Sequence, residues 1–94
     1  MVVEIEISPE ASGQIENVYK YLTVKFSKKV TDDFLEKVIR TVNQISVWKY
    51  SGMAAKKKSF RKILITPHNL MIYKISRNKI LIHSVFDTRQ NLKK

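Results

Sequence analysis

The chain has 94 residues, of which 44% are hydrophobic and 28% charged, a composition typical of a small folded protein rather than a disordered or fibrous one. It contains no cysteine, which excludes disulfides, thiolate nucleophiles and cysteine-based zinc sites. Eighteen Lys and Arg residues against eight Asp and Glu give a net charge of +10, so we expect an anionic partner such as nucleic acid or an acidic protein.

The length and the start of the chain indicate one domain, residues 1–94, that works in the cytoplasm. Apolar runs are only a few residues long, whereas a membrane span needs roughly 18, so we expect no membrane association. Glu4 and Glu6 interrupt the apolar residues that follow Met1, which argues against a secretory signal.

The first half of the chain predicts a strand followed by two helices. Residues 3–7 alternate between apolar and charged side chains, which is the period of a strand. The Ser-Pro-Glu segment that follows is typical of a helix start, and apolar spacing predicts a helix over 9–26. A second apolar stripe predicts a helix that ends near residue 47, with either Ser27 or Thr31 as its N-cap. So short a link predicts an antiparallel helix hairpin.

The second half predicts a loop over 48–58, a meander of three strands and a basic tail over 87–94. The strands are expected at 60–65, 70–75 and 80–86, joined by short turns rich in Pro, Asn and Arg. The fold class is therefore α+β, with the helices packed on one face of a mostly antiparallel sheet. We expect the other face to be a shallow basic concavity.

The charge is divided unevenly along the chain. Residues 1–36 hold four bases and seven acids, a net of −3, whereas residues 37–94 hold fourteen bases and Asp87, a net of +13. A surface with no electrostatic task normally mixes its signs. We therefore expect the working surface in the second half.

Several polar and aromatic residues are candidates for function or for packing. His83 could face either the core or the concavity, whereas Tyr73 is expected in the core because it alternates with apolar neighbours. Trp48 and Tyr50 flank Lys49 and could stack on bases, anchor a partner or cover the edge of the core. The two histidines are isolated from carboxylates in the sequence, so we expect no metal and no cofactor.

The stretches IEISPEASGQIENVYKYL and FRKILITPHNLMIYKISRNKILIHSVFDTRQN resemble the opening and the closing strands of the RelE/ParE superfamily. The resemblance spans about residues 3–91 and rests on the order and spacing of individually weak motifs. It implies the toxin of a type II toxin–antitoxin pair, of the plasmid-stabilisation type, held inactive in a hetero-oligomer with a cognate antitoxin. RelE-like members cut mRNA in the ribosomal A site without a metal, and ParE-like members inhibit DNA gyrase.

The resemblance also implies site residues. Arg61 stands in the family's aromatic-Arg pair and Arg89 after the last strand, so both are candidate phosphate clamps, with His83 as the candidate proton carrier. The other basic residues expected to bind nucleic acid or the target are Lys56, Lys57, Lys58, Lys62, Lys93 and Lys94.

Two departures from the family pattern bear on the target. Leu70 stands where RelE-like enzymes have a central arginine, and no Tyr follows Tyr73, so the C-terminal tyrosine of many members is missing. These departures favour a ParE-like toxin that acts on gyrase, with a RelE-like mRNA endoribonuclease as the alternative. A hypothesis of another class is a non-toxic basic protein that binds nucleic acid.

We expect the antitoxin to lay an acidic or amphipathic segment across the helix hairpin and the basic face.

Overall fold

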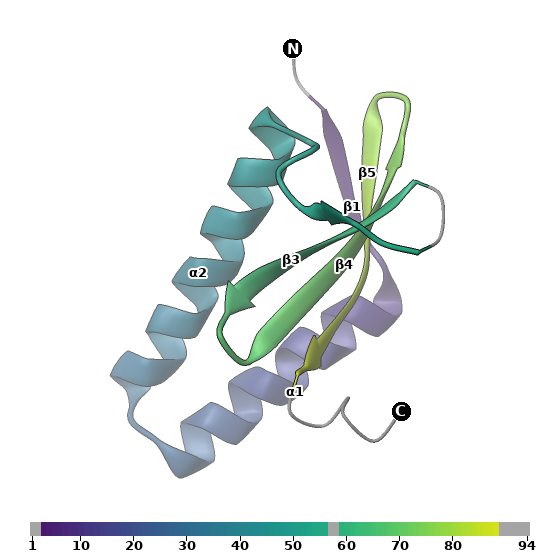
Figure 1. Ribbon diagram of the computed structural model, residues 1–94. Coiled ribbons are helices and arrows are strands. Elements are labelled where there is room, and N and C mark those ends of the chain that lie inside the picture. The colour runs from purple at the N-terminus through teal and green to yellow at the C-terminus, as the bar shows by residue number, and fades with distance from the viewer. Residues whose placement is uncertain (1–2, 57–58, 89–94) are drawn as a thin grey trace.

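The computed structural model describes residues 3–56 and 59–88, which form two helices and five strands (Figure 1). In chain order these are β1 (Glu4–Ile7), α1 (Pro9–Lys25), α2 (Lys28–Val47), β2 (Met53–Ala54), β3 (Phe60–Thr66), β4 (Asn69–Ser76) and β5 (Lys79–Asp87). The strand, helix hairpin and three-strand meander expected from the sequence are confirmed. Within the described residues, neither helix is long and apolar enough to cross a membrane.

Local capping interactions set where the helices begin. The Ser8 side chain accepts a hydrogen bond from the Ala11 amide, and Pro9 is the first residue of α1. Ser27, rather than Thr31, caps α2, and its hydroxyl oxygen accepts a hydrogen bond from the Val30 amide.

Two lysines lie in the first turn of α2, where their positive charge interacts unfavourably with the positive end of the helix dipole. Ion pairs with two aspartates one turn later compensate for this repulsion. Lys28 lies 2.9 Å from Asp32, and Lys29 lies 3.7 Å from Asp33. The hydrogen bond and the charge of Asp32 raise the pKa of Lys28 above its ordinary value. The pairing lets α2 begin at the earlier of the two possible caps.

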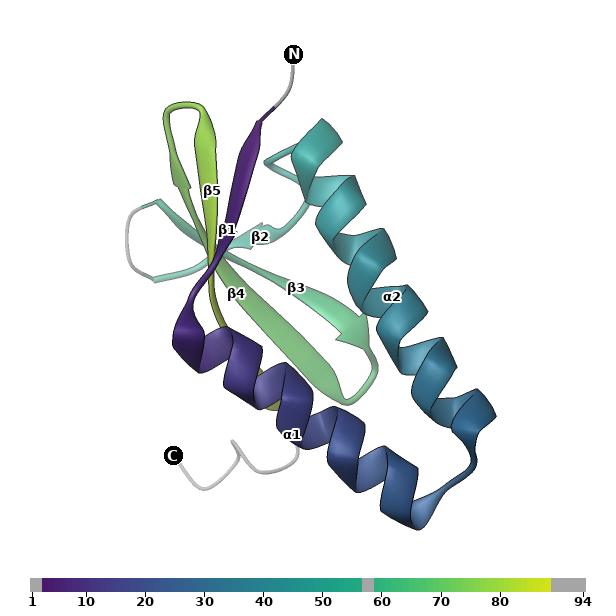
Figure 2. The same ribbon diagram turned by 180° about the vertical axis from the view of Figure 1, so that it is seen from behind.

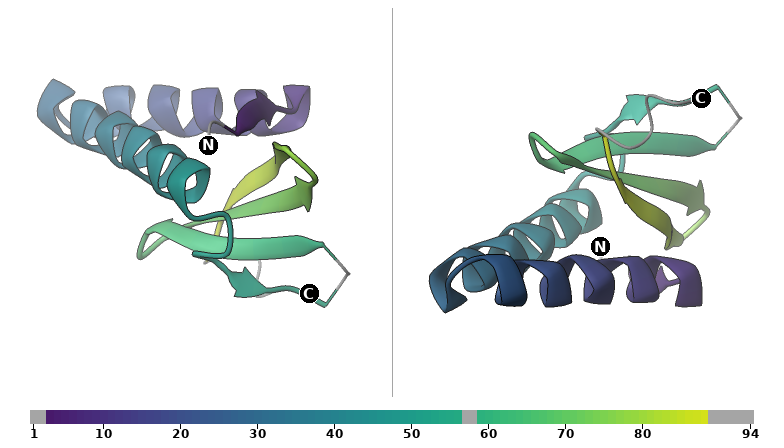
Figure 3. Two further views of the ribbon diagram at one scale, coloured as in Figure 1. Left: turned by 90° about the horizontal axis from the view of Figure 1, so that it is seen from above. Right: turned by 90° about the horizontal axis from the view of Figure 1, so that it is seen from below.

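The strands form one sheet in the order β1-β5-β4-β3-β2. Neighbouring strands are antiparallel except for β1, which runs parallel to β5 and pairs Ile5 with Ile80. Both helices lie on the same side of this twisted sheet, with α1 against β5 and α2 against β3 (Figures 2 and 3).

The core lies between the helices and the sheet. Tyr73 is fully buried there, as the sequence predicts. The other buried apolar residues are Ala11, Phe34, Val38 and Ile45 from the helices and Ile65, Met71, Ile80, Ile82 and Val85 from the sheet. The helices thus leave the opposite face of the sheet uncovered, and this is the open face.

Candidate functional site

The open face carries an apolar row where the sequence predicts a basic concavity. The strand register places Leu64, Leu70 and Phe86 side by side across β3, β4 and β5. Leu64 is exposed, and the other two are half-buried. The expectation of a basic surface is wrong along this row, because alternation places the row's apolar side chains on the face that the helices do not cover. Leu70, for which the resemblance implies an arginine in RelE-like enzymes, is part of it.

A bulge in β5 places His83 on the open face. Tyr73 pairs with Ile82 and Ile72 pairs with Ser84, so His83 is the extra residue between them. Its exposed ring lies edge-on to Phe60, with 5.4 Å between the ring centroids. Val85, two residues further on, is buried in the core.

His83 lines a depression of about 320 Å³ on the open face. The lining residues are Ala55, Lys56, Phe60, Ile72, His83 and Ser84. The imidazole Nδ1 lies 3.3 Å from the Ser84 hydroxyl, and no carboxylate of the described chain pairs with it to orient it as a general base. The depression can therefore hold an anionic group beside Lys56. Among the described residues, however, it has no carboxylate that would polarise the imidazole of His83.

Arg61 lies on the opposite face of β3 from Phe60 and Lys62, so the structure does not bring it to His83. Its Nε donates a 2.8 Å hydrogen bond to the Gly52 carbonyl, and its guanidinium lies 5.1 Å from the centre of the Tyr50 ring. Lys56 and Lys62 are exposed, and Lys62 lies on the open face beside Ile72. The predicted site residues Lys57, Lys58, Arg89, Lys93 and Lys94 lie outside the described residues.

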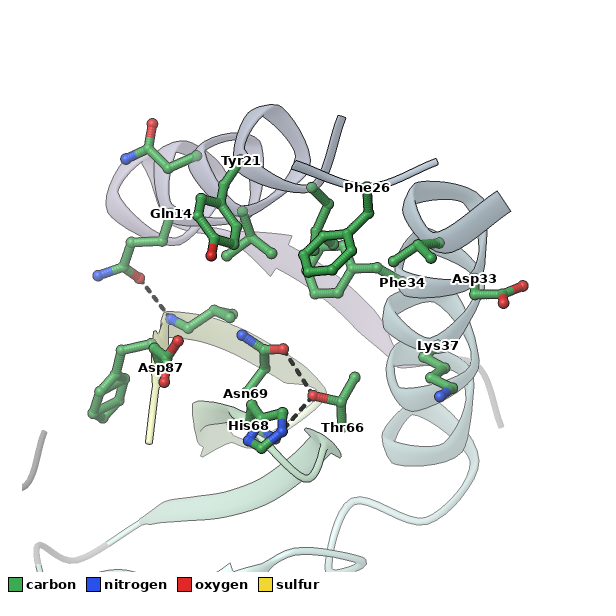
Figure 4. Close-up of a pocket in the computed structure, with 16 residues that line it drawn as sticks. Gln14, Tyr21, Phe26, Asp33, Phe34, Lys37, Thr66, His68, Asn69 and Asp87 are labelled. Atoms are coloured by element: carbon green, nitrogen blue, oxygen red, sulfur yellow. Dashed lines mark hydrogen bonds between the residues drawn. The ribbon is translucent and has the colours of Figure 1, made fainter. Parts of the chain in front are cut away.

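An apolar cleft of about 920 Å³ lies between the helix hairpin and the far end of the sheet (Figure 4). From the helix side, Tyr21, Phe26 and Phe34 line it, and His68 and Asn69 lie opposite on the turn between β3 and β4. Asn69 accepts a 2.7 Å hydrogen bond from the Thr66 hydroxyl, which fixes that turn. The exposed rings of Tyr21 and Phe26 in a concave surface are typical of a binding groove.

Apart from Arg40 and Lys79, the described cations of the second half are in no ion pair with a described carboxylate. Within the described residues, all five ion pairs use acids from the first 36 residues. Lys49, Lys56, Arg61, Lys62, Lys74 and Arg77 are in none of them. The uneven charge of the sequence therefore persists on the folded surface. In residues 3–56 and 59–88, no three His, Cys, Asp or Glu side chains gather as metal ligands would.

Residues 5–92 match the protein family described as the ParE toxin of the type II toxin-antitoxin system parDE. The chain belongs to the ParE toxin family. This match covers nearly the whole sequence and agrees with the resemblance to the RelE/ParE superfamily. No curated protein sequence matches the chain closely enough to count as a relative.

Solved structures, two of them from toxin–antitoxin systems, share the fold of this ParE-family chain. A chain of the chromosomal ParDE system from P. aeruginosa superposes with a TM-score of 0.77 at 9% identity, covering 92% of this chain and 96% of that one. A chain of the E. coli DinJ-YafQ toxin-antitoxin complex gives 0.69 at 12% identity, covering 96% and 97%. The YoeB dimer from Staphylococcus aureus gives 0.63 at 17% identity, covering 92% and 97%.

The cleft is the main feature of this ParE-family toxin that the sequence does not predict. About half of Tyr21 is exposed there, and its ring contacts Phe26 edge-on, with 6.4 Å between the ring centroids. The feature of the sequence that could indicate the cleft is the apolar stripe of α1, which continues to Phe26 at the hairpin turn. The turn lies beyond the edge of the sheet (Figure 2), so the sheet does not bury the end of this stripe.

Proposed function

We propose that this ParE-family protein arrests growth by acting on DNA gyrase, and that a cognate antitoxin holds it inactive. The observation that favours gyrase over mRNA as the target is the apolar row on the open face. Metal-free RNA cleavage needs cations at the scissile phosphate and groups that move a proton. Leu64, Leu70 and Phe86 supply neither, and the nearest candidate arginine of the described chain, Arg61, is directed to the other face.

The cleft between the helix hairpin and the sheet supports an antitoxin partner. Its apolar rings fit one face of an amphipathic helix, the recurring mode in which a groove binds a partner segment. Acidic residues on that segment would meet the unpaired cations of the second half. The P. aeruginosa and E. coli structures are toxin–antitoxin assemblies of the same fold. Both the antitoxin and gyrase place the activity in the cytoplasm.

One observation favours the alternative, a RelE-like mRNA endoribonuclease. His83 and Lys56 share a depression on the open face, so a proton carrier lies beside a cation. In this alternative, Arg89 would add the phosphate clamp from outside the described residues, and the ribosome would complete the site.

Inducing the protein in its host separates these functions. We expect growth arrest with filamentous cells and a DNA-damage response, because a poisoned gyrase leaves DNA breaks, and we expect rescue by the gene encoded beside it. Cell morphology, a damage-response reporter and the mapping of mRNA ends provide the measurements.

Each other outcome identifies a different function. Transcripts cut in the ribosomal A site, with cleavage lost in His83→Gln, would replace gyrase by mRNA as the target. Harmless expression together with steeply salt-dependent binding to generic DNA or RNA would indicate a non-toxic nucleic-acid-binding protein.

A further inference from the structure

A rigid aromatic and cationic surface lies at the C-terminal end of α2, and neither the core nor the cleft uses it. We call it the Trp48 patch, and it consists of Trp48, Lys49, Tyr50 and Arg61. Trp48 is 60% exposed and Tyr50 is 48% exposed. Their rings meet edge-on, with 5.7 Å between the ring centroids. Covering the edge of the core, one of the roles expected from the sequence, therefore does not account for most of the Trp48 surface or for about half of the Tyr50 surface.

Hydrogen bonds fix the loop that carries the patch. The buried Tyr73 hydroxyl donates to the Lys49 carbonyl at 2.8 Å and accepts from the Gly52 amide at 2.9 Å. Arg61 Nε donates to the Gly52 carbonyl, and the Ser51 hydroxyl donates to the Trp48 carbonyl at 2.7 Å. A surface held in this way loses little conformational entropy when it binds.

The charge around the rings is positive. The Lys49 ammonium lies 5.6 Å and the Arg61 guanidinium 5.1 Å from the centre of the Tyr50 ring. No carboxylate of the described residues forms an ion pair with either cation. The patch therefore offers an apolar anchor, Trp48, beside two cations that an acidic group can neutralise.

The composition of the patch favours a protein over a nucleic acid. Tryptophan, tyrosine and arginine are the residues that dominate binding energy at protein interfaces. Platforms for single strands present successive free ring faces for bases. Here cations already lie over the Tyr50 ring, which leaves Trp48 as the free ring.

The patch is also separate from the cleft. The cleft takes its α2 side chains from Val30 to Lys37, about three turns of helix before Trp48, a separation of roughly 15 Å along the axis. We infer that the Trp48 patch contacts the target, binding an acidic protein segment that buries Trp48, while the antitoxin occupies the cleft. This inference rests on the proposed function, because it requires that the chain has a protein target.

The test compares Trp48→Ala with Ile39→Ala. Ile39 is 59% exposed on α2 and lies outside the core, the cleft and the patch, so its truncation removes a similar exposed apolar side chain. We expect Trp48→Ala to abolish growth arrest and to weaken binding of the purified chain to gyrase at least about tenfold, as a central anchor does. Lys49→Glu should weaken both, whereas Ile39→Ala and the charge control Lys25→Glu should leave both within about twofold.

Thermal unfolding and capture by the co-expressed antitoxin must stay unchanged in Trp48→Ala, which shows that the variant folds. Full growth arrest by Trp48→Ala would overturn the inference. If this variant arrests growth but no longer binds the antitoxin, the patch is a contact for the antitoxin instead of the target. Trp48 is the only tryptophan of the chain. Quenching of its fluorescence by a single-stranded oligonucleotide of thymidines would make nucleic acid the occupant and also overturn the inference.

The same experiment separates this inference from the proposed function. If the wild-type chain arrests growth without binding gyrase, the proposed target is wrong, and the growth arrest of Trp48→Ala still decides on the patch. If the wild-type chain does not arrest growth, both the proposed function and the inference are overturned.

Discussion

Tyr73 is the residue that joins the sheet to the loop after α2. It lies in the middle of β4 with no exposed surface, and its hydroxyl both donates to and accepts from that loop. Gly52 is required at the other end of this contact, because a Cβ there would lie 2.7 Å from the Lys62 carbonyl oxygen and 2.9 Å from the Tyr73 hydroxyl. Burial of Tyr73 follows from strand alternation, but its role as an anchor depends on a loop 21 residues earlier in the chain.

We predict that Tyr73→Phe lowers the free energy of unfolding by about 1–3 kcal/mol. The substitution leaves the Gly52 N–H and the Lys49 carbonyl without the partner that their burial requires. Urea unfolding measures this change, with Tyr19→Phe as the control, because Tyr19 is 41% exposed, whereas Tyr73 is fully buried, and the same atom is removed. Equal stability of the two variants would contradict the role assigned to the Tyr73 hydroxyl.

His83 shows why a site residue can be predicted while its surroundings cannot. The sequence identifies it as the candidate proton carrier. Its face depends on the bulge between Ile82 and Ser84, and no local residue pattern of β5 predicts that extra residue. Arg61 is also identified by the sequence, but the Gly52 carbonyl and the Tyr50 ring hold it on the other face.

At the scale of elements, the helices and the meander could be predicted because their signals are local. Apolar spacing and the Ser8 cap specify α1 to within one residue, and apolar spacing specifies the end of α2, whereas its start is left open between Ser27 and Thr31. The two-residue strand β2 is too short to show a period, and it forms only because β3 supplies hydrogen-bond partners. The parallel pairing of β1 with β5 joins the two ends of the chain, so it also depends on the whole fold.

An ion pair supports the attachment of β1 to β5. Glu6 lies 3.1 Å from Lys79, and this hydrogen bond, with the charges of Glu6 and Glu4, raises the pKa of Lys79 above its ordinary value. A raised lysine pKa stabilises the folded state below the unfolded pKa, and the contribution is lost as the pH rises through the folded pKa.

We therefore predict that Glu6→Gln lowers the melting temperature at pH 8, and that the difference from the wild type vanishes once the pH exceeds the raised pKa of Lys79. Both side chains are about half exposed, so the difference should also shrink in high salt. Glu10→Gln is the control, because Glu10 forms no ion pair with the described residues. A difference from the wild type that persists at alkaline pH would rule out the ion pair as its cause.

At the scale of the whole molecule, the sequence predicts the excess positive charge but not its distribution over surfaces. Acids of the first 36 residues are paired mainly within their own helices, so the described cations of the second half other than Arg40 and Lys79 stay free for a partner. The open face nevertheless carries an apolar row, because the late strands present Leu64, Leu70 and Phe86 there. In residues 3–56 and 59–88, positive charge therefore accompanies apolar binding surfaces.

The most direct test of gyrase as the target is a supercoiling assay with the purified chain. We predict that the chain inhibits supercoiling by gyrase, that one equivalent of antitoxin restores it, and that programmed ribosomes leave their mRNA intact. Full supercoiling at saturating concentrations of the chain, together with mRNA cut in the ribosomal A site, would contradict the account.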